Sequence, residues 1–302
     1  MRNTFAAEIT RLAIKNKKIV LLSGDIGNKL FDNYKKKHKK RFFNCGVAEA
    51  NMTTVAAGLA KSKFLPFTYT IASFNTYKIV EQIKLDICYP NLQVIIVGVG
   101  SGLSYSNLGT THHSIEDIAV LNGINNLQII CPADPVELKS LIPQIIKSKK
   151  PTYLRIGKKN EKNVFKKNCS SKIGEPTIIK KGSNLCVFST GNILVNIMDA
   201  LDKNKKKIAP QIVNIHTIKP INEIKILKFL KKFKKIIIIE EHLENGGLGS
   251  IIMKIAAKYK TNNTFKNINL GNKFITGAGD LSSIRNKFKL DSHSLGKEIF
   301  NF

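Results

Sequence analysis

The sequence of 302 residues has no tryptophan and only 21 acidic residues against 49 basic ones, which gives a formal net charge of +28. Such a charge can indicate a nucleic-acid or membrane-surface partner. Arginine, however, supplies only five of the basic residues, and the lysines are scattered through every segment. We therefore interpret the charge as a compositional bias and predict neither a nucleic-acid partner nor a membrane partner.

Cysteine is sparse and widely spaced. The number of cysteines is odd and no C-x-x-C pair is present, which argues against a disulfide framework and against a zinc site. Such cysteine usage is typical of a protein in a reducing compartment. The five residues are Cys45, Cys88, Cys131, Cys169 and Cys186.

Long hydrophobic runs are missing as well. Aliphatic stretches such as Val94–Val97 and Ile236–Ile239 are far shorter than the ~20 residues that a membrane-spanning helix needs. The amino-terminal segment alternates apolar and polar residues at helical spacing and lacks the apolar core of a signal peptide. We therefore expect a cytoplasmic protein.

Short aliphatic runs alternate with longer amphipathic stretches, a pattern typical of a parallel sheet covered by helices on both faces. The fold class is therefore predicted to be α/β, with two doubly wound parallel-sheet domains. The strands expected in the first half are Ile19–Leu22, Phe64–Tyr69, Gln93–Val97, Leu127–Cys131 and Thr152–Ile156. The helices expected there are Glu49–Lys61, Thr76–Cys88, Ser114–Leu121 and Pro135–Lys147.

A lysine-rich stretch at 157–182 lacks periodicity and predicts a connector. We place the domains at 1–160 and 183–302, with a linker at 161–182. The strands expected in the second domain are Leu185–Ser189, Gln211–Ile215, Ile236–Glu240 and Lys273–Thr276, and its helices lie near 192–203, 221–232 and 247–258.

The most informative motif is Gly46-Val47-Ala48-Glu49-Ala50-Asn51-Met52, which places an acid at the start of a helix of small residues. A carboxylate there gains about 0.3–1 kcal/mol from the helix dipole, so Glu49 can be explained as a helix-start residue. The functional interpretation is a buried carboxyl that offers a hydrogen bond to the ring of a ligand.

This motif resembles the glutamate motif of the pyrimidine-binding domain in thiamine-diphosphate enzymes of the transketolase group. The resemblance implies that Glu49 is catalytic and contacts the 1′ nitrogen of the cofactor's aminopyrimidine, which activates the cofactor. Asp25 and Ile26 match the family's turn beside the cofactor. Phe74 falls where the family keeps an aromatic residue that stacks on the aminopyrimidine.

Further segments match the family in the same order. Thr110-Thr111-His112-His113 resembles the loop whose histidine faces the cofactor and the substrate, so the resemblance implies that His112 is catalytic and binds the substrate. His113 stands in place of the family's glutamine, and we predict that it too is catalytic, moving protons or binding substrate oxygens beside His112. Arg155 lies in the strand that closes the domain, where the family's arginine can bind a sugar phosphate; an interface ion pair is the alternative. His216–Pro220 and Glu240–His242 resemble the family's C-terminal domain.

Two positions depart from the family pattern. A family histidine that donates to sugar hydroxyls falls at Gly100, and a family acid falls at Leu108. Loss of a hydrogen-bond donor and of a carboxylate changes which sugar hydroxyls the site can recognise, so the sequence does not identify the substrate. The loop Ser101–Asn107 offers other donors.

The Gly-Asp-Gly…Asn motif that holds the cofactor's diphosphate and Mg²⁺ in this family is absent, and so is the domain that carries it. The resemblance therefore implies a split enzyme. This chain would be the C-terminal subunit of a transketolase that moves a two-carbon ketol unit between sugars or sugar phosphates. A second, N-terminal subunit would hold the diphosphate of thiamine diphosphate and Mg²⁺, in an α2β2 assembly.

Three other functions remain open. They are the β subunit of a 2-oxoacid dehydrogenase, a deoxyxylulose-phosphate-synthase-like enzyme, and a partner subunit without catalysis. A dinucleotide-binding loop at Gly98, Gly100 and Gly102 is disfavoured, because Leu103 occupies the position of its last glycine.

Overall fold

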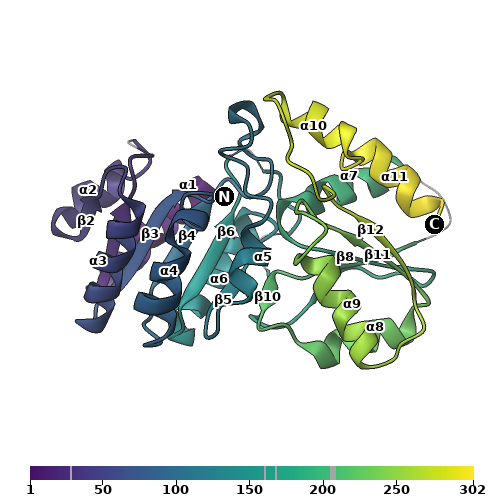
Figure 1. Cartoon of the computed structure of the whole chain (residues 1–302), viewed down its shortest axis with the longest axis horizontal. Coiled ribbons are helices and arrows are strands. Elements are labelled where there is room, and N and C mark those ends of the chain that lie inside the picture. Colours follow the sequence, from purple (N-terminus) through teal and green to yellow (C-terminus); the bar gives the residue numbers. More distant parts are fainter. Residues whose placement is uncertain (28, 160, 167–168, 205–208) are drawn as a thin grey trace.

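The computed structural model describes residues 1–27, 29–159, 161–166, 169–204 and 209–302. Two α/β units lie side by side, the first formed by the amino-terminal half and the second by the carboxyl-terminal half (Figure 1). The strand order is β10-β5-β6-β4-β3-β1-β2 in the first sheet and β12-β11-β8-β9-β7 in the second. The predicted α/β class with two parallel-sheet domains is confirmed.

Six strands of the first sheet run parallel, because helices or long loops connect them. They are β1 (Ile19–Ser23), β2 (Phe42–Asn44), β3 (Leu65–Ile71), β4 (Ile95–Val99), β5 (Gln128–Ile130) and β6 (Thr152–Ile156). The edge strand β10 (Thr217–Lys219) comes from the second half of the chain and pairs antiparallel with β5. The two domains therefore share a sheet edge as well as a linker.

Successive residues of each strand point to opposite faces of the sheet and build two separate cores. On one face, Leu21 and Phe67 pack with α1 (Arg2–Lys15) and α6 (Pro135–Ser148), beside α2 (Asp32–His38). The other face is covered by α3 (Glu49–Lys61), α4 (Val80–Gln82), a π-helix at Ile83–Cys88, and α5 (Asp117–Asn122). Helices therefore cover both faces of the first sheet, and a ligand-binding site is expected at the strand ends.

The second sheet has four parallel strands and one antiparallel edge strand. They are β8 (Cys186–Ser189), β9 (Gln211–Asn214), β11 (Lys235–Ile239), β12 (Thr264–Ile268) and the antiparallel β7 (Thr177–Lys180). Its helices are α7 (Leu194–Lys203), α10 (Leu281–Lys287) and α11 (Ser292–Phe300) on one face, and α8 (Glu223–Lys232) and α9 (Leu248–Lys258) on the other.

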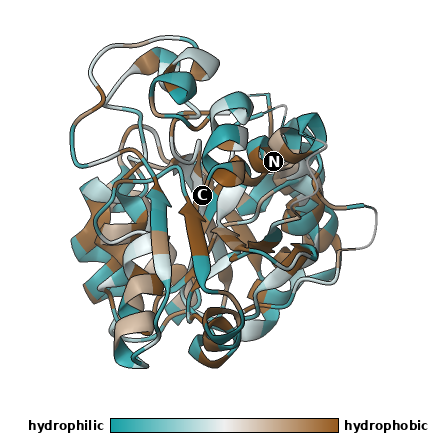
Figure 2. Cartoon of the chain, turned by 90° about the vertical axis from the view of Figure 1, so that its right-hand side faces the viewer, coloured by the Kyte–Doolittle hydropathy of each residue, from teal (hydrophilic) through white to brown (hydrophobic). Residues whose placement is uncertain are grey.

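The core under α8 and α9 continues into the core of the first domain. Phe188 and Ile218 belong to the same buried cluster as Leu121 and Ile129. Figure 2 shows hydrophobic residues concentrated on the central strands and hydrophilic residues on the outer surfaces. The two domains therefore pack through a continuous apolar core.

Two predictions about the second domain are wrong. Lys273–Thr276 is a loop rather than a strand, and the edge position belongs to β12, whose three central residues are half-buried. Part of the expected linker, Thr177–Lys180, forms β7. Residues 167–168 of that linker lie outside the described part of the chain. In the ranges described, no helix is long and apolar enough to cross a membrane.

Candidate active site

The carboxyl ends of β1, β3, β4 and β6 meet at one edge of the first sheet. Asp25 and Ile26 follow β1 closely, Phe74 follows β3, Gly100 follows β4, and Lys158 follows β6. In open parallel α/β sheets, ligands bind in the crevice outside this edge. The predicted cofactor residues thus converge on the side of the sheet where a ligand is expected.

Glu49 is the first residue of α3 and is only 4% exposed. Its Oε2 accepts a hydrogen bond of 3.0 Å from Nζ of Lys78, a side chain that is 55% exposed. The Lys78 ammonium also lies 5.6 Å from the centre of the Phe74 ring. The buried acid and the aromatic ring therefore share one neighbour, the exposed ammonium of Lys78.

The turn that carries Asp25 is tied to the turn that precedes Glu49. The N–H of Asp25 donates to the carbonyl of Gly46 at 3.1 Å, and the N–H of Ile26 donates to the carbonyl of Gly24 at 2.7 Å. Asp25 is exposed and Ile26 is half-buried. These hydrogen bonds bring the two segments that resemble the cofactor motifs together.

Phe74 and His112 contact each other edge to face, with ring centres 5.1 Å apart at 62°. The ring centre of Tyr105 lies 6.1 Å from that of His112. The hydroxyl of Ser73 donates to the carbonyl of Thr111 at 3.2 Å and so holds the loop against the end of β3. The three rings, Phe74, Tyr105 and His112, form an aromatic cluster beside Glu49 and Lys78.

The departure at Gly100 has a structural cause. Its φ is +89°, and a Cβ there would overlap the ring of Tyr105. A histidine would therefore be strained in this backbone and would collide with a neighbour. Tyr105 fills the space that a larger residue at Gly100 would need.

Lys158 places a cation beside this cluster, with Nζ 4.1 Å from the centre of the Tyr105 ring. Partial burial lowers the pKa of Lys158, and the charges of Lys159 and Arg2 lower it further. Burial also lowers the pKa of His112, and the charge of Lys158 adds to this effect. At neutral pH, His112 is therefore a neutral imidazole that can either accept or donate a proton.

His113 is buried, whereas its neighbour His112 is half-buried. His113 is 2% exposed, and among the described residues neither of its ring nitrogens has a hydrogen-bond partner. Burial lowers its pKa, while the charges of Glu116 and Glu241 oppose the effect. Because the side chain is enclosed, we do not assign a direct substrate contact or a catalytic role to His113.

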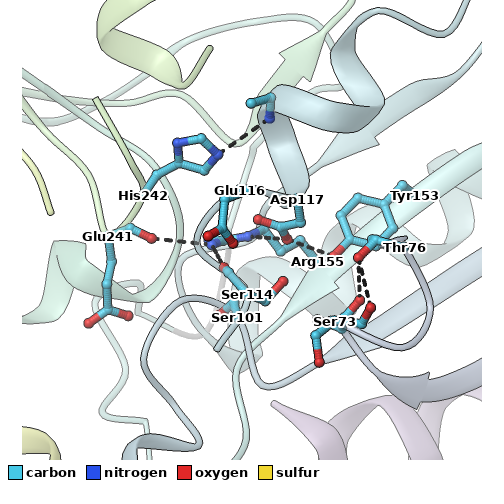
Figure 3. A network of polar contacts seen from close by, with 12 residues as sticks. Ser73, Thr76, Ser101, Ser114, Glu116, Asp117, Tyr153, Arg155, Glu241 and His242 are labelled. Carbon is cyan, nitrogen blue, oxygen red and sulfur yellow. Dashed lines mark hydrogen bonds and ion pairs between the residues drawn. The ribbon is translucent and has the colours of Figure 1, made fainter. Parts of the chain in front are cut away.

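Arg155 is enclosed at the domain interface, with its side chain 2% exposed. Its Nε contacts Asp117 Oδ2 at 2.8 Å, and its Nη2 donates to the carbonyls of Ser114 at 2.8 Å and Glu241 at 3.3 Å (Figure 3). Burial alone would raise the pKa of Asp117, but the charge and hydrogen bond of Arg155, together with His242 and Tyr153, lower it below its ordinary value. We therefore assign Arg155 to the interface ion pair, the alternative named above, rather than to a substrate anion.

Three residues of the site were not predicted: Lys78, Tyr105 and Lys158. Lys158 could have been found by the rule that points to the ends of parallel strands, since it follows Thr152–Ile156 directly. Tyr105 lies in the loop expected to offer donors. Nothing in the local sequence singles out Lys78, because its contact with Glu49 joins residues 29 positions apart.

The described residues fit one end of the implied cofactor. Glu49 and Phe74 present a carboxyl and a ring face, which suit a flat heterocycle with a hydrogen-bonding nitrogen. Across the ranges that the structure describes, no group of three or more His, Cys, Asp or Glu side chains could hold a metal ion.

Two family models match the chain. The model "Transketolase, pyrimidine binding domain" covers residues 1–162, and "Transketolase, C-terminal domain" covers residues 174–292. Together they account for both structural units.

Two relatives that align over most of their own length are named as subunits of transketolases. A subunit of apulose-4-phosphate transketolase from Actinobacillus succinogenes is 32% identical over 86% of this chain and 84% of its own length. The 6-deoxy-6-sulfo-D-fructose transketolase subunit SqwH of a Clostridium species is 28% identical over 83% of this chain and 78% of its own. A solved structure described as "Split gene transketolase, inactive beta4 tetramer" superimposes with a TM-score of 0.88 and 25% identity, covering 99% of this chain and 96% of that one. The chain belongs to the transketolase family and corresponds to the C-terminal subunit of a split transketolase, a transferase that works with a partner subunit and depends on thiamine diphosphate.

Proposed function

We propose that Glu49 of this subunit holds the aminopyrimidine ring of thiamine diphosphate while a partner subunit holds the diphosphate. The complex would transfer a two-carbon ketol unit from a ketose phosphate to an aldose phosphate. The observation that carries this proposal is the buried carboxyl of Glu49, which stands at the strand-end edge beside the aromatic cluster and has an exposed lysine as its partner.

When bound, thiamine diphosphate supplies an electron sink for the charge that develops as a carbon–carbon bond breaks. Glu49 would bind the ring nitrogen and share a proton with it, after Lys78 moves aside. Phe74 would offer its face to the ring, while Asp25 and Ile26 would line the ring's edge.

His112 and Lys158 would act on the sugar. A neutral imidazole can take a proton from a substrate hydroxyl and return it, and the lowered pKa of His112 keeps it neutral above pH ~6.5. Lys158, beside Tyr105, would bind an anionic group at the far end of the substrate. The two relatives named above support an anionic sugar, since one acts on a sugar phosphate and the other on a sulfosugar.

The partner subunit would complete the site and hold Mg²⁺. Apolar side chains next to Glu49 support an interface on this face: Val47 is 77% exposed, and Val55 and Leu85, on α3 and the π-helix that packs against it, are 44% and 49% exposed. Exposed apolar patches of this kind are typical of binding surfaces. An α2β2 assembly would pair two such faces with two partner chains.

The test is a substrate panel on the complex of this chain with its partner subunit, thiamine diphosphate and Mg²⁺. We expect ketol transfer from a ketose phosphate to an aldose phosphate, and slower transfer with the unphosphorylated ketose. Release of CO₂ from 2-oxoacids with a lipoyl acceptor, without ketol transfer, would assign the chain to a 2-oxoacid dehydrogenase. Condensation of pyruvate with an aldose phosphate would assign it to the synthase alternative, and no turnover with any pair would support a non-catalytic subunit.

A further inference from the structure

A buried carboxylate of the C-terminal domain contacts the loop 101–114, which carries Tyr105 and His112. Glu241 comes shortly after β11, and its side chain is 1% exposed. Its Oε2 accepts a hydrogen bond from the N–H of Leu103 at 3.2 Å, while Oε1 accepts one from Nε of Arg285 on α10 at 2.7 Å. One oxygen therefore holds the loop of the first domain, and the other is fixed by a helix of the second.

The two ends of the loop 101–114 are hydrogen-bonded to each other next to the contact with Glu241. Gly102 and Ser114 exchange two backbone hydrogen bonds, each 3.0 Å long. Arg155 then joins the carbonyls of Ser114 and Glu241, as Figure 3 shows. Both ends of the loop thus meet the segment that carries Glu241.

This contact depends on a glycine. The φ of Gly102 is +59°, and a Cβ at this position would overlap the Glu241 carboxylate. The backbone of the loop can approach the carboxylate only because no side chain stands between them.

The outer part of the loop is held by a second segment of the C-terminal domain. The hydroxyl of Thr110 donates to the carbonyl of Ile275 at 2.8 Å, and the N–H of Gly279 donates to the carbonyl of Ser106 at 3.1 Å. Tyr105 and His112 lie on the loop between these attachments. Their placement against Phe74 is therefore set from the second domain as well as from the first.

We propose that Glu241, fixed by Arg285, is a positioning residue that orients Tyr105 and His112 for the transferase reaction. The inference rests on the proposed function only in taking these two side chains as substrate-facing. A buried carboxylate with two donors gives charge-assisted hydrogen bonds, and removing it leaves the Leu103 N–H and the Nε of Arg285 without this acceptor. The C-terminal domain thereby takes part in shaping the active site.

The experiment is amide hydrogen exchange of the free chain, followed in peptides that cover residues 101–114. In Glu241→Ala we expect exchange about tenfold faster at Leu103 and its neighbours, because a charged hydrogen bond has been lost. Glu241→Gln should lie between this variant and the wild type. The matched control is Glu244→Gln, since Glu244 is exposed on the same segment, and it should leave the loop unchanged.

Protection of peptides from β3 reports whether each variant remains folded. If β3 stays protected and exchange at 101–114 does not change in Glu241→Ala, the proposal is overturned. If Glu241→Ala does not fold, Glu241→Gln and Gly102→Ala decide in the same way, because each weakens the same contact and should speed exchange of the loop.

Activity of the reconstituted complex gives the second readout. A positioning role predicts that Glu241→Gln raises KM for the sugar and lowers kcat, while KM for thiamine diphosphate stays within twofold. An equal loss of affinity for the cofactor would show a general loss of structure and contradict the proposal. If the chain is not part of a transketolase, the wild-type complex will show no turnover. The hydrogen-exchange result on the free chain would still hold, because it does not depend on turnover.

Discussion

Glu49 and Lys78 form an ion pair between a buried acid and an exposed lysine. The atoms Oε2 and Nζ lie 3.0 Å apart, yet the acid is 4% exposed and the lysine 55% exposed. A pair with one solvent-exposed partner contributes only ~0–1 kcal/mol. The lysine can therefore move away at little cost, and the acid remains available to a ligand.

Lys78→Gln tests this interpretation. We expect the apparent KM for thiamine diphosphate in the reconstituted complex to fall by up to about fivefold, because a competing cation of ~0–1 kcal/mol is removed. Cofactor titration of initial rates measures this change. A loss of activity of more than tenfold would instead place Lys78 in the catalytic machinery.

Lys158→Met separates the proposed anion site from the rest of the substrate site. Loss of a charged hydrogen bond, worth about 1.5–3 kcal/mol, should raise KM for the ketose phosphate by about 10–100-fold. The KM for an unphosphorylated ketose should hardly change. Lys254→Met, at an exposed position on α9, is the control; equal effects of both variants on the phosphorylated substrate would remove the assignment.

The same variant predicts a shift in the titration of His112. Burial lowers the pKa of His112 and the positive charge of Lys158 lowers it further, because a nearby cation disfavours the imidazolium. Removing that cation should raise the pKa of His112 toward its ordinary value. NMR titration of the imidazole measures the shift directly, and the acid limb of the pH–rate profile should move to higher pH. A pKa that stays in place would show that the two groups do not interact.

Gly100→Ala is expected to destabilise the chain by about 1–3 kcal/mol, because Gly100 has a positive φ and is packed against Tyr105. Urea unfolding measures the loss. Adding Tyr105→Ala should recover only part of it, since the backbone strain persists without the ring. Wild-type stability in Gly100→Ala would contradict the explanation given for the missing family histidine.

Arg155→Met tests the assignment of that residue to the domain interface. Breaking a buried ion pair from one side costs about 3–5 kcal/mol, since it leaves Asp117 without its partner. The control is Arg11→Met, because Arg11 pairs with Glu8 but is 52% exposed, and it should cost at most ~1 kcal/mol. Normal stability of Arg155→Met, combined with a raised KM for sugar phosphate, would restore the substrate role.

The sequence allowed the parallel-sheet architecture to be predicted because aliphatic strands and amphipathic helices leave local patterns. The strand Thr152–Ile156 and the helix Glu49–Lys61 were placed with their observed bounds. The edge strand β12 was missed because its residues are only partly buried and carry no clear alternation of apolar side chains. Edge strands have one free side, so packing constrains their composition less.

The site was predictable only where a motif carries the chemistry. Glu49 and Phe74 were found from their motifs, and they lie on either side of Lys78. The burial of Arg155 could not be foreseen, because it depends on Asp117 and on the carbonyl of Glu241, which lies 86 residues away. Contacts between domains leave no local signal in the chain.

Activation of the cofactor by the Glu49 carboxyl of this subunit can be measured apart from the rest of the reaction. The most direct measurement is the rate of hydrogen–deuterium exchange at the reactive thiazolium carbon of thiamine diphosphate in the reconstituted complex, compared between the wild type, Glu49→Gln and the exposed control Glu81→Gln. We expect a fall of about 10²–10⁴-fold in Glu49→Gln, the usual contribution of a positioned proton-transfer group, and no change in the control. Wild-type exchange in a folded, cofactor-bound Glu49→Gln complex would contradict this role of Glu49.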